Sequence, residues 1–121
     1  MARIYAGRIR LAENLFSDRP PRPRAGQHYL RGPVPLDWLC VAALLPGKSL
    51  HVGVALWYTA GLNRSRKVAL SNVLGRRFGL DRNSKYRGLD WLEEAGLISV
   101  ERKLGCAPVV SINAAPSDRE A

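Results

Sequence analysis

The stretch from Leu70 to Ile98, LSNVLGRRFGLDRNSKYRGLDWLEEAGLI, decides the fold of this 121-residue chain. Serine and aspartate are favoured immediately before helices, because their side-chain oxygens accept hydrogen bonds from backbone N–H groups of the first turn. Ser71 therefore predicts a helix over residues 72–78. Asp81 predicts a second helix over residues 82–95, so the stretch forms two helices joined by a tight turn.

Glycines support this interpretation. Gly79 and Gly96 follow the two expected helices, where glycine adopts the left-handed backbone conformation at little cost. Gly75 is small enough to let the two helices approach each other at a steep angle. The side chains expected to face inward or to fill the turn are Val73, Leu74, Phe78, Leu80, Leu89 and Leu92.

A compact unit of residues 35–113 surrounds this helix pair. Ahead of the pair, the sequence predicts a helix over residues 35–45, stopped by a Pro-Gly dipeptide, and another that is capped by Ser49 and ends at Gly61. After the pair, β-branched residues flank a glycine-containing segment, residues 103–108, and predict a two-stranded hairpin.

The charge of the chain is strongly positive and uneven. Nineteen Lys and Arg residues outnumber ten Asp and Glu residues, which gives a formal charge of +9 and a sequence pI near 10.4. Residues 1–34 carry a net charge of +5 and residues 64–87 carry +7, so the rest of the chain is mildly acidic. Such an excess on a small domain points to a polyanionic partner, most often nucleic acid and less often an anionic membrane surface.

With its neighbours, the decisive stretch resembles the winged helix-turn-helix of bacterial transcription regulators such as the GntR and MarR groups. The resemblance covers about residues 68–112. The matching motifs are Gly79-Leu80-Asp81-Arg82 at the turn, Tyr86-Arg87-Gly88-Leu89 in the recognition helix, Leu92-Glu93-Glu94-Ala95-Gly96-Leu97-Ile98 at its exit, Val100-Glu101-Arg102-Lys103-Leu104-Gly105 in the wing and Pro108-Val109-Val110-Ser111-Ile112 in its return strand.

The resemblance implies a mainly α fold with a small β-hairpin, that is, a winged helix-turn-helix with a three- to four-helix core and a two-stranded wing over residues 99–112. Lys85 departs from the pattern, because family members usually place a β-branched core residue there. We expect its aliphatic stem to be buried and its ammonium group to point outward. The chain also lacks the ligand-binding domain that GntR-type regulators carry, so we expect no small-molecule effector.

The resemblance further implies double-stranded DNA as partner, with the recognition helix, residues 82–95, in the major groove. Its leading half carries side chains suited to base edges or to phosphates, and the preceding segment carries side chains suited to phosphates. The expected base readers are Asn83, Ser84 and Arg87, and the side chains expected to serve bases or phosphates are Arg82 and Lys85. The expected backbone contacts are Ser71, Arg64, Arg66, Lys67, Arg76 and Arg77, and the expected wing contacts are Arg102 and Lys103. The acidic residues Asp90, Glu93 and Glu94 fall at the far end of the helix.

Both ends of the chain differ from this unit. Residues 1–34 form a basic, Pro/Arg-rich arm, in which prolines predict an extended linker over residues 17–33. The apolar residues before that linker predict a short strand or helix that docks on the domain or on a partner. Residues 114–121 are polar and predict a flexible tail.

The sequence argues against several other classes of protein. Apolar residues make up 46% and charged residues 24% of the chain, as in globular proteins, and no apolar run approaches the ~20 residues of a membrane span. Cys40 and Cys106 match no metal spacing, and His28 and His51 have no catalytic or metal partners at suitable spacing. We therefore expect a cytoplasmic, nucleoid-associated protein with free thiols, no metal or cofactor and no enzymatic activity.

Two alternative functions remain open at this level, together with the oligomeric state. A winged helix of this size also suits replication, partition or another mobile-element function, and it also suits a protein–protein interaction module. Scaffold helices of related regulators often dimerise, which makes a homodimer a further hypothesis. The residues that would form the dimer contact are Leu36, Leu39, Ala43 and Trp57.

Overall fold

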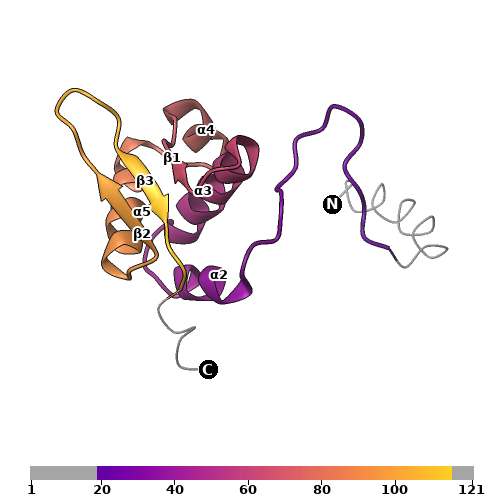
Figure 1. Cartoon of the computed structure of the whole chain (residues 1–121), viewed down its shortest axis with the longest axis horizontal. Coiled ribbons are helices and arrows are strands. Elements are labelled where there is room, and N and C mark those ends of the chain that lie inside the picture. Colours follow the sequence, from indigo (N-terminus) through magenta and orange to yellow (C-terminus); the bar gives the residue numbers. More distant parts are fainter. Residues whose placement is uncertain (1–18, 116–121) are drawn as a thin grey trace, which may run out of the picture.

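The computed structural model describes residues 19–115, and the expectations for residues 1–18 and 116–121 lie outside this part of the chain. Within it, two helices are followed by a short strand, two further helices and a pair of strands (Figure 1). The helices are α2 (Leu36–Ala43), α3 (Ser49–Asn63), α4 (Asn72–Arg77) and α5 (Arg82–Glu94), and the strands are β1 (Lys67–Val68), β2 (Ile98–Glu101) and β3 (Val109–Ile112). The expectation of helices followed by a small hairpin is therefore confirmed in part, since the described residues form a mixed structure of four helices and a small antiparallel sheet.

The strands form a three-stranded antiparallel sheet in the order β1-β3-β2. The hairpin of β2 and β3 pairs Ile98 with Ile112 and Glu101 with Val109. The expectation of only two strands is wrong, because Lys67 pairs with Ser111 and adds β1 to the other side of β3. This four-helix, three-stranded arrangement of residues 19–115 is compatible with a helix-plus-wing fold.

Helices α4 and α5 begin at the capping residues that the sequence predicts. Ser71 Oγ accepts a hydrogen bond from Leu74 N at 3.1 Å, and Asp81 Oδ1 accepts one from Ser84 N at 2.7 Å. Gly79 has a φ of 74°, so the turn uses the left-handed conformation that glycine allows. Each helix of the pair consequently starts where its cap predicts.

The ends of α2 and α3 differ from the prediction. Helix α2 ends at Ala43, and Ser49 is the first residue of α3 and not its N-cap, because its hydroxyl donates to the carbonyl of Pro46 at 2.7 Å. Helix α3 runs past Gly61 and stops where Arg64 adopts a φ of 52°. Gly61 stays helical, and the side chain of Arg31 packs directly on it.

Helix α3 is the centre of the core and packs against α2, α4, α5 and β1. Two glycines permit its closest contacts. A Cβ atom at Gly53 would lie 2.7 Å from the Trp38 ring, and a Cβ atom at Gly88 would lie 2.5 Å from Val52 Cγ2. The largest fully buried side chains of this core are Trp38, Val52, Leu56, Leu89, Leu92, Leu97, Ile98 and Val110.

Two expectations about the helix pair are wrong. The side chain of Val73 is 64% exposed, because α4 is short and turns Leu74 and Phe78 toward the core instead. A Cβ atom at Gly75 would make only ordinary contact with Leu80, at 3.8 Å. The close helix approach depends on Gly88 and on α3, and does not depend on Gly75.

Candidate nucleic-acid interface

The first turns of α5 present polar and cationic side chains to solvent. Arg82, Asn83 and Arg87 are exposed, and Asn83 and Arg87 are four residues apart and so share one helix face. Ser84 is half-buried beside the cap. The hydrogen bond that Asp81 accepts from Ser84 N lowers the pKa of the Asp81 carboxyl below its usual 3.8, so the cap stays charged at neutral pH.

Helix α4 adds two exposed arginines, Arg76 and Arg77, in its last turn. Cations at this position are also favoured by the helix dipole, so part of their role is structural. Within residues 19–115, no carboxylate forms an ion pair with Arg76, Arg77, Arg82 or Arg87. Their charge is therefore available to an outside anion.

Lys85 does not belong to this surface. It is only 5% exposed, and its Nζ donates to the carbonyl of Leu70 at 2.7 Å and to Asn72 Oδ1 at 3.0 Å. Burial lowers the pKa of the Lys85 ammonium below its usual 10.5, and the nearby charge of Arg82 lowers it further. The stem is buried as expected, but the ammonium group points inward. Its hydrogen bonds connect α5 to the N-terminus of α4.

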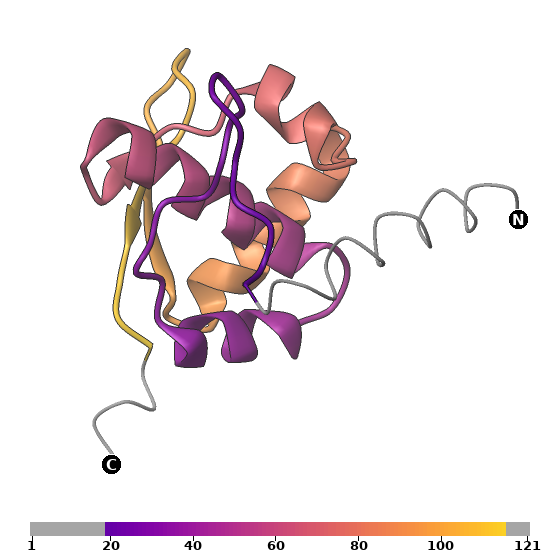
Figure 2. The ribbon, with the colours of Figure 1, turned by 90° about the vertical axis from the view of Figure 1, so that its right-hand side faces the viewer.

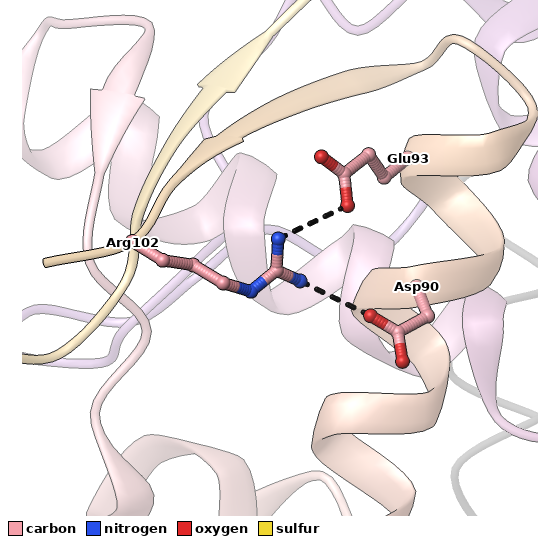
Figure 3. A network of polar contacts seen from close by, with 3 residues as sticks. All are labelled: Asp90, Glu93 and Arg102. Carbon is pink, nitrogen blue, oxygen red and sulfur yellow. Dashed lines mark hydrogen bonds and ion pairs between the residues drawn. The ribbon is translucent and has the colours of Figure 1, made fainter. Parts of the chain in front are cut away.

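Arg102 is also directed differently from the expectation. Its guanidinium lies against the last turns of α5, where it bonds Asp90 at 3.1 Å and Glu93 at 3.3 Å (Figure 3). Two carboxylates therefore already neutralise this side chain. Lys103, the next residue, is exposed and has no ion pair within the described residues.

Arg64 and Arg66 are separated from the rest of the expected surface. Ile112 N donates to the carbonyl of Arg66 at 3.0 Å, and Arg66 Nη2 donates to Asn113 Oδ1 at 2.7 Å. Arg66 therefore lies at the end of the sheet opposite to the β2–β3 loop. Arg64 and Arg66 both line a crevice of about 520 Å³ there, beside Trp38 and Trp57. Lys67 Nζ lies 3.8 Å from Glu101 Oε1, which offsets part of its charge.

Sequence reasoning missed two residues that shape this surface. Lys48, which precedes α3, donates from Nζ to the carbonyl of Gly79 at 2.7 Å and so supports the turn before α5. No local pattern indicates that contact. Gly88 lies inside α5, where glycine lowers helix stability. A glycine at such a position indicates that another helix packs closely against it, so the sequence contained a signal for this contact.

Other kinds of site are not evident in residues 19–115. No group of three or more His, Cys, Asp or Glu side chains there could hold a metal ion, and no helix there is long and apolar enough to span a membrane. Cys40 and Cys106 are exposed free thiols, as the sequence predicts. Compared with protein-family models, with curated proteins and with solved structures, the chain has no match.

Proposed function

We propose that this chain is a winged helix-turn-helix protein that binds double-stranded DNA sequence-specifically and regulates transcription. The observation that carries the proposal is the leading half of α5, where exposed Arg82, Asn83 and Arg87 follow directly on the exposed arginines of α4. The order of elements from α3 to β3 also supports it, because it supplies two crossed helices followed by a hairpin.

The proposed contacts follow from the chemistry of these side chains. Asparagine forms two hydrogen bonds with adenine and arginine forms two with guanine, and both patterns are readable in the major groove. Asn83 and Arg87 are therefore the proposed base readers, with Arg82 beside them. Arg76 and Arg77 would hold phosphates and set the position of α5 without reading sequence.

The charge of α5 changes sign along its length, and this supports insertion by the leading end. Asp90, Glu93 and Glu94 lie in the second half of the helix, and Arg102 compensates the first two. A phosphate backbone would be repelled by that half and attracted by the first half. The exposed tip of the β2–β3 loop, with Lys103, is the proposed contact with flanking DNA.

Selection of bound duplexes from a random pool, followed by titration of the selected site at several salt concentrations, tests the proposal. We expect a defined consensus and an affinity that falls steeply as salt rises, because bound phosphates release counterions. Absence of binding to any duplex at low salt would reject it and favour a protein-binding role.

We also propose a homodimer formed through α2. Leu36 and Leu44 are 71% and 86% exposed, and Cys40 and Ala43 are exposed between them, so α2 has an uncovered apolar face. Trp57 is not part of that face, because its ring lies edge-on against Trp38 at a centroid distance of 5.6 Å and is half-buried. Leu39 is likewise half-buried against the core.

A further inference from the structure

The segment that precedes α2 is rich in arginine. Residues 19–35 form no helix or strand, and they contain four arginines and no carboxylate. Arg22 and Arg24 are exposed and form no ion pair with any residue in the described part of the chain. None of the interactions that define the fold uses their guanidinium groups.

The second half of this segment is fixed on the helices. His28 Nδ1 lies 3.1 Å from Tyr58 Oη on α3. Tyr29 and Leu30 line a cavity of about 310 Å³ together with residues of α3 and α4. A Cβ atom at Gly61 would lie only 2.9 Å from Arg31 Cβ, so the backbone of α3 and the side chain of Arg31 are in close contact.

The first half is shaped by a turn and by prolines. Gln27 N donates to the carbonyl of Arg24 at 2.9 Å, and Arg24 N donates to Gln27 Oε1 at 2.8 Å, so residues 24–27 close a turn. Pro20, Pro21 and Pro23 fix φ and favour an extended backbone before the turn. Arg22 and Arg24 are thus held on a segment with little conformational freedom left to lose on binding.

This turn points to the same end of the molecule as the candidate interface. In Figures 1 and 2 the indigo turn rises toward the end where α4 and the β2–β3 loop lie, while α2 lies at the opposite end. In Figure 1 the turn and the β2–β3 loop lie on opposite sides of α4. Figure 1 thus separates the turn widely from the β2–β3 loop, so the two cationic segments would meet different parts of a duplex bound over this end.

We propose that Arg22 and Arg24 contact the sugar-phosphate backbone of the bound duplex, on the flank of α4 that the β2–β3 loop does not reach. This inference rests on the proposed DNA-binding function. Phosphates are the matching partner, because the planar guanidinium donates two parallel hydrogen bonds to phosphate oxygens. An extended chain advances about 3.1 Å per residue, so Arg22 and Arg24, which are two residues apart, are separated by about 6 Å along the segment and can each reach a different phosphate.

The test compares two variants that lose the same charge at different ends of the molecule. Arg22→Gln/Arg24→Gln removes the proposed contact, and Arg64→Gln/Arg66→Gln removes two arginines at the far end of the sheet. The full chain is titrated with its selected duplex, and the logarithm of affinity is plotted against the logarithm of salt concentration. Each phosphate contact contributes about −0.9 to this slope, so the first variant should flatten it by about 1.8 and the second should leave it unchanged.

Hydroxyl-radical footprinting gives a second readout. Wild type and the Arg64→Gln/Arg66→Gln variant should protect the same nucleotides, whereas Arg22→Gln/Arg24→Gln should lose protection on one flank only. Equal slopes for all three proteins, equal flattening in both variants, or an unchanged footprint would overturn the inference while wild type still binds DNA. Failure of wild type to bind any duplex would instead overturn the proposed function, and the inference with it.

Discussion

At the scale of single residues, Arg87 and Arg76 separate sequence reading from positioning. Arg87 shares a helix face with Asn83, whereas Arg76 lies on α4, outside the helix proposed for the groove. Arg87→Ala should weaken binding to the selected site by about 1–3 kcal/mol, a factor of roughly 5 to 150, with little effect on random DNA. Arg76→Ala should weaken binding to both and flatten the salt slope by about 0.9. Anisotropy titrations on selected and scrambled duplexes measure both effects, and equal losses for Arg87→Ala on the two duplexes would contradict the base-reading role.

Lys85 is expected to matter for stability and not for DNA. Lys85→Ala removes the donor to the Leu70 carbonyl and to Asn72 Oδ1 and leaves a buried acceptor unpaired, which costs about 1–3 kcal/mol. Arg82→Ala, three residues earlier and exposed, is the control and should change the free energy of unfolding by less than about 0.5 kcal/mol. Urea denaturation measures both. If the two variants were equally stable, the inward ammonium group would not be contributing.

The same lysine predicts a dependence of stability on alkaline pH. Burial lowers the pKa of Lys85 in the folded chain below its usual 10.5, so between these two values the unfolded chain binds more protons than the folded chain. The contribution of Lys85 to the free energy of unfolding therefore rises with pH in that window. At lower pH the ammonium group is charged in the folded chain, and the full cost of burying that charge lowers the stability. Relative to Lys85→Met, which keeps the stem and cannot titrate, wild type should gain stability as pH rises toward 10.5. A constant difference between the two proteins across that window would contradict the prediction.

At the scale of secondary-structure elements, two glycines should respond differently to the same substitution. Gly88→Ala would bring a methyl group within 2.5 Å of Val52 Cγ2, and the α3–α5 crossing would have to open. Such overpacking costs about 1–3 kcal/mol, partly offset by the better helix propensity of alanine, worth up to about 1 kcal/mol. Gly75→Ala meets only Leu80 at 3.8 Å and should be neutral or slightly stabilising. Thermal unfolding of both variants checks the order, and a larger loss for Gly75→Ala would show that the crossing is misassigned.

The β2–β3 loop offers a second matched pair. Arg102 already bonds Asp90 and Glu93 on α5, but all three side chains are at least one-third exposed, so the ion pairs contribute at most about 1 kcal/mol. Arg102→Gln should therefore cause little destabilisation and leave the salt slope of DNA binding unchanged. Lys103→Gln should flatten that slope by about 0.9, because its ammonium group is free to meet a phosphate. A flatter slope for Arg102→Gln would mean that DNA displaces its carboxylate partners.

The elements that the sequence predicts are those encoded by neighbouring residues. Ser71 and Asp81 are recognisable as caps because each bonds a residue three positions ahead. The two-residue strand β1 has no such local signal, since it exists only through its pairing with distant β3. The same limit applies to the candidate site. Arg66 and Arg102 are recognisable from the sequence as cations, but the residues that bond them lie in other elements. Only the structure shows that these two side chains are directed away from the candidate surface.

At the scale of the whole molecule, the two proposed surfaces lie at opposite ends. Helix α4 and the β2–β3 loop are at one end, and α2 is at the other, next to the point where β3 leaves the sheet (Figure 1). A contact between two copies through α2 would therefore leave the candidate DNA surface of each copy uncovered. Dimer formation and binding to a single DNA site are separable for this reason.

The last prediction uses that separation. Leu36→Glu/Leu44→Glu places two negative charges on the apolar face of α2, and both side chains are exposed, so the fold should tolerate the change. Sedimentation at high micromolar concentration should show a dimer for wild type and a monomer for this variant, with unchanged affinity for a single DNA site. Leu62→Glu, at a half-exposed position on α3, is the control and should remain dimeric. A wild-type chain that sediments only as a monomer would contradict the dimer and leave the DNA surface unaffected, whereas loss of DNA affinity in the α2 variant would show that the two ends are coupled.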